Sequence, residues 1–298
     1  MPKFTQLLKE AGVDSPHNFM VVGLRGSNLV GLHDAKGFDL RFDHSLLEVR
    51  QLTREQFPQV SNTLYDQFIA WNLINEDSAK AFLGTMHTNV GPRSRLLLVT
   101  GRMRGLASIN AVHAGITFKL EVAVVPSQNF TVAFKFLQHP DESGNISTTR
   151  LNPSDARWLI NKLNWIYGPQ ANISFEMVEA DWVKVDKILG ESLNKEAFLN
   201  HIVERKNKSA DLNIFFVRKW KGGEAGGTHF PEEEAVVVEE NPKSLPVVDD
   251  ADPFLVNLAH EVAHYLGADH HDRENVLLSR GRQSTRLDRG LVLAINPP

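Results

Sequence analysis

The sequence predicts a mixed fold of the α+β or α/β class, arranged as two domains. Its 298 residues with 42% apolar content suit about two compact domains. Over residues 129–238, strand-like and helix-like stretches alternate, which favours a largely parallel sheet covered by helices. We therefore expect a mixed α/β domain over residues 1–125 and a second domain over residues 129–298.

The elements of the first domain are predicted from short apolar runs and two helical patterns. An amphipathic helix is expected at Phe4–Ala11, and a longer one at about residues 54–81, where apolar side chains recur at spacings of three and four. Continuous or alternating apolar runs predict strands at Phe19–Leu24, Asp39–Phe42, Arg95–Thr100 and Ile116–Val125. None of these patterns indicates a function for the domain.

Capping and turn signals divide the second domain into elements. A helix is expected to begin at Asn152-Pro153, because Asn caps a helix N-terminus well and Pro suits the first turn. Its end is expected at residues 168–169, Gly-Pro, and a further helical region is expected at residues 181–203. Apolar runs predict strands at Phe130–Leu137, Ile173–Val178, Leu212–Val217 and Ala235–Val238.

Composition and charge exclude several classes of function. The chain has no cysteine, which excludes disulfides, cysteine nucleophiles and cysteine-ligated metals. Its formal net charge of −4 lacks the basic excess that phosphate binding requires, so we expect no nucleic-acid partner. The N-terminus lacks a secretory signal, and no apolar run reaches the roughly 20 residues of a membrane span. We expect no membrane partner and a protein that is cytoplasmic or exported by a signal-independent route.

The strongest signal in the chain is a helix expected to begin at Asp252-Pro253 and to end at Gly267. Asp and Pro are typical of a helix N-terminus, and Gly supplies the positive φ that commonly ends a helix. Within this helix stand His260 and His264. Because they are four residues apart, they lie one turn apart on one face, and both imidazoles can bind one metal ion.

Neighbouring residues extend this pair into a candidate catalytic site. Glu261 emerges about 100° around the helix from His260, so it lies beside the metal without being directed at it. His270 follows His264 by six residues and can fold back after Gly267 as a third ligand. Three protein ligands leave the fourth position open, which distinguishes a catalytic zinc site from a structural one.

The string His260-Glu261-x-x-His264-x-x-Gly267-x-x-His270 resembles the zinc motif of the metzincin clan of metallopeptidases. A string of this kind arises by chance in roughly one of 10,000 chains of this composition. The resemblance implies Zn²⁺ bound by His260, His264 and His270, with Glu261 as the catalytic base that takes a proton from zinc-bound water. It therefore implies a zinc-dependent endopeptidase that hydrolyses peptide bonds of protein or peptide substrates.

The resemblance covers residues 129–298 and implies a metzincin-like catalytic domain. Such a domain has a twisted, mostly parallel sheet with one antiparallel edge strand, a zinc helix and a small C-terminal subdomain. Peptide substrates lie extended along the edge strand, here expected beside the Gly-rich loop at residues 221–231. The family Met beneath the metal is matched by Leu277, a nearly volume-conserving replacement. Some members have an additional tyrosine ligand where this chain has Ser279.

The sequence leaves four alternatives open. His271 is a second candidate for the third ligand in place of His270. A purely structural metal site would make the second domain a non-catalytic, zinc-stabilised binding module. Residues 1–125 are also compatible with a bacterial effector or toxin-like protein, in which they would contact a partner or secretion machinery. Inhibition of the peptidase by these residues is the fourth alternative, and it would have to work without a thiol switch.

Overall fold

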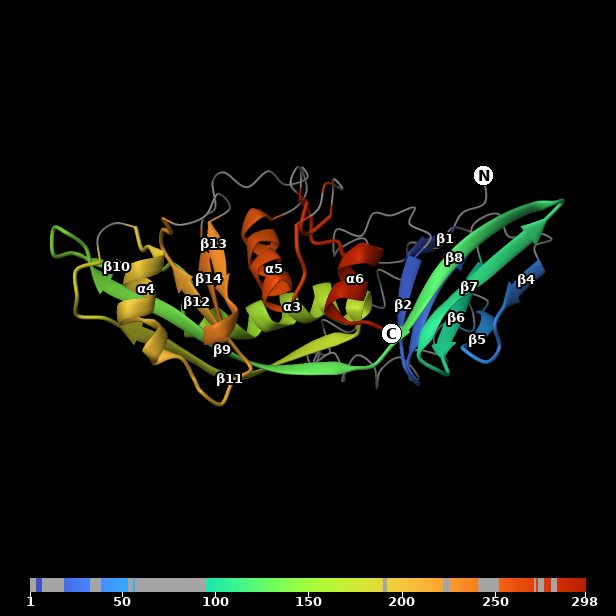
Figure 1. The fold of residues 1–298 in the computed structure, drawn as a ribbon, viewed down its shortest axis with the longest axis horizontal. Helices are drawn as coiled ribbons and strands as arrows, with labels where there is room; N and C mark the ends of the chain where they lie inside the picture. The colour runs from blue at the N-terminus through green and yellow to red at the C-terminus, as the bar shows by residue number, and fades with distance from the viewer. Residues whose placement is uncertain are drawn as a thin grey trace. The chain divides into compact units, whose positions relative to one another are not determined.

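The computed structural model describes residues 4–6, 19–32, 39–52, 56, 95–189, 192–221, 226–240, 252–270, 272, 276–279 and 283–298. Over these residues the protein is mostly β-sheet with few helices (Figure 1), which confirms a mixed α and β fold at this coarse level. The chain divides into two compact units. One comprises Met1–Gln128, Asn164–Ser174 and Arg286–Pro298, and the other comprises Asn129–Leu163 and Phe175–Thr285.

The first unit contains two four-stranded sheets. All neighbours in the first sheet are antiparallel, in the order β1 (Phe4–Gln6), β3 (Ser27–Leu32), β6 (Arg95–Gly101), β5 (Leu47–Leu52). In the second sheet β2 runs parallel to β8 and the other pairs are antiparallel, in the order β2 (Phe19–Gly23), β8 (Ile116–Val125), β7 (Gly105–His113), β4 (Asp39–Phe42).

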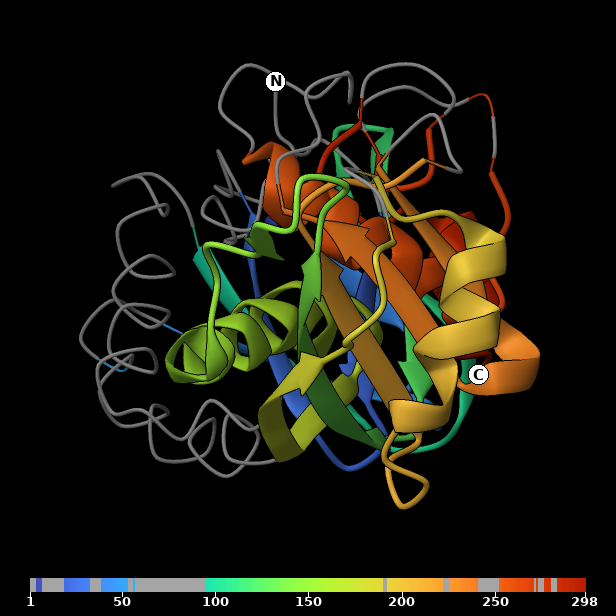
Figure 2. The same ribbon diagram turned by 90° about the vertical axis from the view of Figure 1, so that its left-hand side faces the viewer.

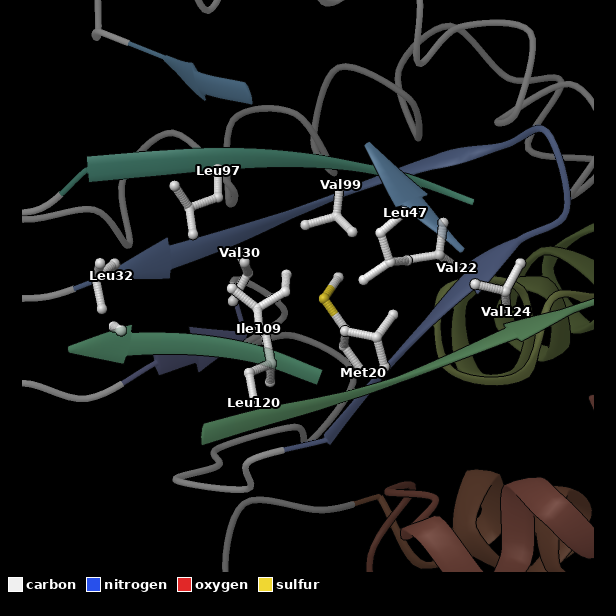
Figure 3. Close-up of a cluster of buried hydrophobic side chains, with 12 residues drawn as sticks. Met20, Val22, Val30, Leu32, Leu47, Leu97, Val99, Ile109, Leu120 and Val124 are labelled. Atoms are coloured by element: carbon white, nitrogen blue, oxygen red, sulfur yellow. The ribbon is translucent and has the colours of Figure 1, made fainter. Parts of the chain in front are cut away.

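Side chains from both of these sheets share one apolar core (Figure 3). Alternate residues of a strand point to the same face, so Leu120, Val122 and Val124 of β8 all enter this core, as do Met20 and Val22 of β2. Each fully buried aliphatic side chain contributes roughly 1.5–3 kcal/mol relative to exposure. The other buried members are Val30, Leu32, Leu47, Leu97, Val99, Ile109 and Ala111.

The four strand predictions for the first unit are confirmed as β2, β4, β6 and β8. The helix predicted at Phe4–Ala11 is wrong over the part of it that the structure describes. Phe4–Gln6 forms a strand, β1, which pairs antiparallel with β3. Pairing with a strand distant in sequence replaces the helix that local spacing favours. The rest of that predicted helix lies outside the described residues. So does nearly all of the predicted helix at residues 54–81.

A six-stranded sheet forms the centre of the second unit. Its order is β10–β9–β12–β14–β13, with β11 also paired to β9. Strands β9, β12 and β14 are parallel, whereas β13 is antiparallel to β14 and β10 is antiparallel to β9. Thus two antiparallel strands occur where the sequence predicts one. The bounds are β9 (Gln128–Pro140), β10 (Ile146–Thr148), β11 (Ile173–Lys184), β12 (Leu212–Val217), β13 (Gly227–Phe230) and β14 (Ala235–Glu239).

Helices cover both faces of this sheet (Figure 2). Neighbouring residues of a strand point to opposite faces. Phe215 of β12 packs against Phe198 of α4 (Lys195–His201), and Phe216 packs against Phe254 of α5 (Pro253–Tyr265). Trp158 of α3 (Ala156–Ala171) stacks on Phe254, so α3 and α5 lie on the same side. Thus α5 is held against the sheet by aromatic contacts.

The beginning of α3 is as predicted, but its end is not. Asn152 accepts a hydrogen bond from the Ser154 amide before a short turn, η2 (Pro153–Asp155). The predicted end at residues 168–169 is wrong, because the helix continues through Pro169 to Ala171. It ends at Asn172, whose φ of 55° is the left-handed conformation common after a helix.

The helical region predicted at residues 181–203 is wrong in its first part. Asp181 lies within β11, where it and Glu179 pair with the buried Lys135 amine of β9 at 3.1 and 2.9 Å. Among the described residues of this range, helical structure is limited to α4 and the following turn η3 (Val203–Arg205). A buried amine needs partners, and these two carboxylates can reach it together because they alternate on one face of a strand.

The last helix that the structure describes is α6 (Arg289–Ile295), which clusters with the first unit. Asp288 caps it by accepting a hydrogen bond from the Leu291 amide at 2.9 Å. Among the helices that the structure describes, none has both the length and the apolar character needed to cross a membrane.

Candidate metal centre

The helix α5 carries two of the three predicted metal ligands, and its sequence fixes where it begins. The Asp252 side chain accepts a hydrogen bond from the Phe254 amide at 3.0 Å, as expected of an N-cap residue. Pro253 occupies the first turn, where its missing N–H costs no helical hydrogen bond. The helix prediction is therefore confirmed at this end.

The other end of α5 closes with a turn that directs the chain back toward the helix. Gly267 has a φ of 97°, and its amide donates to the His264 carbonyl at 3.0 Å. The Ala268 amide donates to the Ala263 carbonyl at 3.0 Å, so the two bonds form a Schellman-type ending. Only glycine adopts this backbone conformation without strain. The turn brings His270 back beside the helix.

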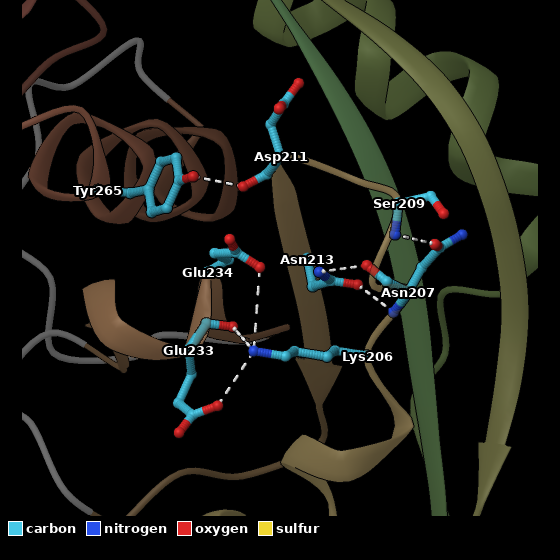
Figure 4. A network of polar contacts seen from close by, with 8 residues as sticks. All are labelled: Lys206, Asn207, Ser209, Asp211, Asn213, Glu233, Glu234 and Tyr265. Carbon is cyan, nitrogen blue, oxygen red and sulfur yellow. Dashed lines mark hydrogen bonds and ion pairs between the residues drawn. The ribbon is translucent and has the colours of Figure 1, made fainter.

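Polar contacts anchor the same end of the helix to the sheet (Figure 4). The Tyr265 hydroxyl donates to the Asp211 carbonyl, directly before β12. The Lys206 amine donates to the Glu233 carbonyl at 3.0 Å and pairs with the Glu233 carboxylate at 3.1 Å. Glu233 belongs to the turn η4 (Pro231–Glu233) between β13 and β14. The Tyr265 contact joins the end of α5 to the start of β12, and the Lys206 contacts join the segment after η3 to the turn η4.

The three predicted ligands His260, His264 and His270 meet at their Nε2 atoms. The Nε2 separations are 3.1 Å between His260 and His264, 3.3 Å between His264 and His270, and 3.0 Å between His260 and His270. Tetrahedral ligands at about 2.0–2.1 Å from Zn²⁺ lie about 3.3 Å apart. Because the three separations are near this value, the triad fits a single metal ion. His260 is buried, His264 half-buried and His270 exposed.

Hydrogen bonds fix the tautomer of two of these rings. The Nδ1 atom of His264 donates to the Ala268 carbonyl at 2.8 Å. The Nδ1 atom of His260 donates to the Leu277 carbonyl at 3.2 Å and to the Gln283 side-chain oxygen at 2.9 Å. Since carbonyl oxygens only accept, the proton lies on Nδ1 and the lone pair on Nε2. Two lone pairs that face each other repel unless a cation lies between them, so this arrangement is typical of metal ligands.

Burial keeps both of these imidazoles neutral. Burial, together with the positive charges that His264 and His270 would carry, lowers the pKa of His260 to about 3. The pKa of His264 is lowered to about 4, because the effect of burial outweighs the hydrogen bond to the Ala268 carbonyl, which raises it. A neutral imidazole is the form that binds a metal ion. Protons therefore do not compete for these two ligands at neutral pH.

Glu261 is a buried carboxyl group next to this triad and is not one of its three ligands. Burial raises its pKa to about 8. Its side chain lies against Gly227 of β13, where an added Cβ would be 2.7 Å from the Glu261 Cγ and 2.8 Å from its Oε1. Because real Cβ atoms do not approach so closely, glycine is needed at this position. Gly227, the last glycine of the predicted Gly-rich loop, thus makes room for the predicted base.

The strand β13 follows α5 along one face. Gly227 and His229 alternate with residues that point away, so both face the helix. The His229 ring stacks on His264 with ring centroids 5.0 Å apart. At the start of the strand, the Asn257 side chain of α5 donates to the Gly226 carbonyl at 3.1 Å. The edge strand is therefore tied to the same helix that carries two of the three histidines.

The segment that the resemblance aligns with a metzincin Met turn contacts His260. Leu277 is fully buried, and its carbonyl accepts the His260 hydrogen bond described above. Ser279 is also buried, and its carbonyl accepts a hydrogen bond from the Gln283 amide at 3.1 Å. His271 lies outside the described residues, so the alternative that it replaces His270 stays open.

Sequence reasoning did not find three residues that contact the site: Asn257, His229 and Gln283. Asn257 offered a signal, because a polar residue one turn before Glu261 interrupts the apolar part of the helix. The two others had none. His229 is a lone histidine in a short strand, and Gln283 follows His260 at no regular spacing.

Comparisons with known proteins identify no family for the chain. No family model and no curated protein matches it. Domains 5–6 of the S-layer protein SbsC are similar to 45% of this chain over 57% of their own length, with 12% identity and a TM-score of 0.22. Domains 1–6 of the same surface-layer protein match 51% of this chain over 17% of their length, with 10% identity and a TM-score of 0.24. This chain thus spans less than two thirds of both structures, and such scores carry no argument about fold or function.

Proposed function

We propose that this protein is a zinc-dependent endopeptidase that hydrolyses peptide bonds of protein substrates. One observation carries the proposal. Three histidine Nε2 atoms lie within 3.0–3.3 Å of one another. A buried carboxyl group that is not one of these proposed ligands, Glu261, lies on α5, the helix that carries two of the histidines. This combination of an open three-histidine site and an adjacent base is typical of metal-assisted hydrolysis.

The residues present fit Zn²⁺ in ligand type, number and spacing. His260, His264 and His270 would hold the ion, and an all-histidine site of tetrahedral spacing suits zinc. When bound, the ion lowers the pKa of a water molecule and polarises the carbonyl to be cleaved. A closed structural site would need a fourth protein ligand and would have no use for Glu261 beside it. The geometry therefore favours an enzyme over a zinc-stabilised binding module.

Glu261 would act as the base. It accepts a proton from the attacking water and passes it to the amine that leaves. Burial raises its pKa to about 8, and a nearby cation shifts the pKa back down by favouring the carboxylate. A carboxyl group whose pKa lies near neutrality both accepts and releases protons well. Gly227 permits the position of this side chain beside the edge strand.

The strand β13 would bind the substrate. Among the described residues it pairs with β14 along one edge, and its other edge is available to an extended peptide. A peptide added there runs along α5, because Gly227 and His229 both face that helix. The metzincin resemblance implies parallel strands with one antiparallel edge strand, and β9, β12, β14 and β13 match this pattern, whereas β10 adds a second antiparallel strand at the other end of the sheet.

Exchange of the proposed base tests this function. Glu261→Gln should retain about one zinc per chain and lose cleavage by roughly 10²–10⁴-fold, the usual contribution of a catalytic base. Zinc content and a proteome-wide cleavage profile measure the two effects. Glu196→Gln, an exposed change at the start of α4, is the control. Cleavage that persists in Glu261→Gln, or a wild-type protein without zinc, contradicts the proposal.

A role of residues 1–125 in binding a partner, in delivery or in inhibition stays a hypothesis. The two sheets of the first unit enclose an apolar core, and neither contributes a residue to the three-histidine group. The endopeptidase proposal rests on residues of the second unit alone.

A further inference from the structure

Gln283 is a buried side chain in direct contact with one of the proposed metal ligands. Its Oε1 atom lies 2.9 Å from the His260 Nδ1, and its Nε2 atom lies 3.1 Å from the Ser279 carbonyl oxygen. Because a carbonyl oxygen only accepts, the amide nitrogen must face Ser279 and the amide oxygen must face His260. Gln283 therefore presents an acceptor, and not a donor, to the histidine ring.

The His260 ring is held by two acceptors on the same nitrogen. The Leu277 carbonyl lies 3.2 Å from Nδ1, in addition to the Gln283 oxygen. Both contacts require the proton on Nδ1, which leaves the Nε2 lone pair to face His264 and His270. Two acceptors also restrict rotation of the ring, so they fix its direction as well as its tautomer.

His260 and His264 obtain their acceptors from different sources. The acceptor of His264 is the Ala268 carbonyl, a backbone group set by the turn that ends α5. The closer acceptor of His260 is a side chain 23 residues away. His260 is only 2% exposed, so solvent has little access to replace a lost acceptor. Its orientation therefore depends on the identity of residue 283.

We propose that Gln283 is a positioning residue of the metal centre, which holds His260 in the tautomer and direction that aim Nε2 at the cation. The inference rests on the proposed metal-dependent function. The amide is neutral, so it supplies an acceptor without adding a negative charge beneath the ligand. Partners of this kind typically change metal affinity by about 10–100-fold when they are removed.

The chain contains a matched control for this residue. Gln170 is as buried as Gln283, at 6% exposure, and its amide donates to the carbonyl four residues earlier, Ile166, at 2.8 Å. Its oxygen accepts from the Leu287 amide. A change of Gln170 to Met therefore removes a similar set of hydrogen bonds from a buried site without touching the metal centre.

The experiment titrates the metal-free full-length protein with Co²⁺, followed by its visible absorbance, and then displaces Co²⁺ with Zn²⁺ in a chelator buffer. Gln283→Met should bind both metals about 10–100-fold more weakly than wild type, because His260 loses its closer acceptor. Gln170→Met should stay within about twofold, since distant sites act independently. Gln283→Glu keeps an acceptor oxygen and should bind at least as tightly as wild type. Melting temperatures of the metal-free proteins separate a loss of stability from a loss of affinity.

Equal affinities of Gln283→Met and Gln170→Met would overturn the inference. If Gln283→Met does not fold, Gln283→Glu decides, because a folded variant with weakened metal binding is also contrary to the proposal. Peptidase activity is not needed for this test. A wild-type protein that binds metal but cleaves nothing refutes the peptidase and leaves the role of Gln283 intact, whereas a wild-type protein that binds no metal refutes both.

Discussion

The first unit and the metal centre of the second unit use buried polar groups differently. In the first unit, Gln170 accepts from the Leu287 amide, and the Asn296 side chain donates to the Ala171 carbonyl at 2.6 Å. These amides join backbone segments. In the second unit, His260 and His264 use Nδ1 in the same way but turn their Nε2 atoms toward each other at 3.1 Å. The difference separates polar groups whose hydrogen bonds join parts of the fold from histidines that also have a ring nitrogen placed where a metal ion could bind.

Removal of one of the three histidines should have the largest effect, and it should act on metal affinity. We expect His264→Ala to weaken Zn²⁺ binding by more than about 100-fold, because one of three protein ligands is lost. Chelator competition measures the affinity. Leu120→Ala in the core of the first unit is the control, which should lower the free energy of unfolding by about 2–5 kcal/mol and leave zinc affinity unchanged. A His264→Ala protein with wild-type affinity would show that the histidines only pack.

A methyl group added to the edge strand β13 should have an intermediate effect, and it should act on cleavage. Gly227→Ala places a Cβ 2.7 Å from the Glu261 Cγ and 2.9 Å from the Val237 carbonyl oxygen, so we expect the base and this edge of the sheet to shift while the three histidines stay. We expect cleavage to fall by about 10–100-fold with zinc content unchanged, as misplacement of a catalytic group by about 1 Å does. Gly290→Ala in α6 is the control, because its Cβ would meet only the Asp288 oxygen at 3.4 Å. Loss of zinc from Gly227→Ala would contradict this explanation.

The smallest expected effect is a change with pH in the free energy of unfolding of the metal-free protein. Burial raises the pKa of Glu261 to about 8, so the folded protein holds a proton that the unfolded chain releases. Between pH 6.5 and 8 the free energy of unfolding should therefore fall by up to about 1.4 kcal/mol per pH unit. Below pH 6.5 the sign reverses, because the lowered pKa values of His260 and His264 make the unfolded chain bind more protons. Urea unfolding in the presence of a chelator measures the free energy of unfolding above and below pH 6.5.

Glu261→Gln sharpens this last test. The amide does not titrate, so the fall between pH 6.5 and 8 should disappear while the rise below pH 6.5 remains. If the free energy of unfolding of the variant falls between pH 6.5 and 8 as it does in the wild type, a group other than Glu261 causes the fall.

Much of the sheet structure could be predicted from the sequence, because alternating or continuous apolar runs report directly on buried strands. Leu120, Val122 and Val124 enter one core at a period of two, and β8 is as predicted. The errors arise where distant groups outweigh local pattern. Phe4–Gln6 pairs with β3, and Asp181 extends β11 toward the Lys135 amine. Local spacing contains neither partner.

The candidate site could be predicted only as far as its residues share one helix and its turn. The spacing of His260, His264 and His270 is local, and the structure brings their Nε2 atoms together. Glu261 beside them is local in the same sense. The contacts of His229 and Gln283 depend on the path of a separate strand and a separate loop. Such contacts form only when the chain folds, so they cannot be predicted from the spacing of residues in the sequence.

The unequal exposure of the three histidines has a consequence for metal exchange. His260 is buried and held by two acceptors, whereas His270 is exposed at the end of the turn after α5. If a metal ion is bound here, we expect the exposed ring to leave it first, because the other two rings are more buried. Exchange of the ion is then limited by motion of one surface side chain and does not require the helix to open. A small chelator should therefore remove the metal at a rate that is insensitive to the global stability of the protein.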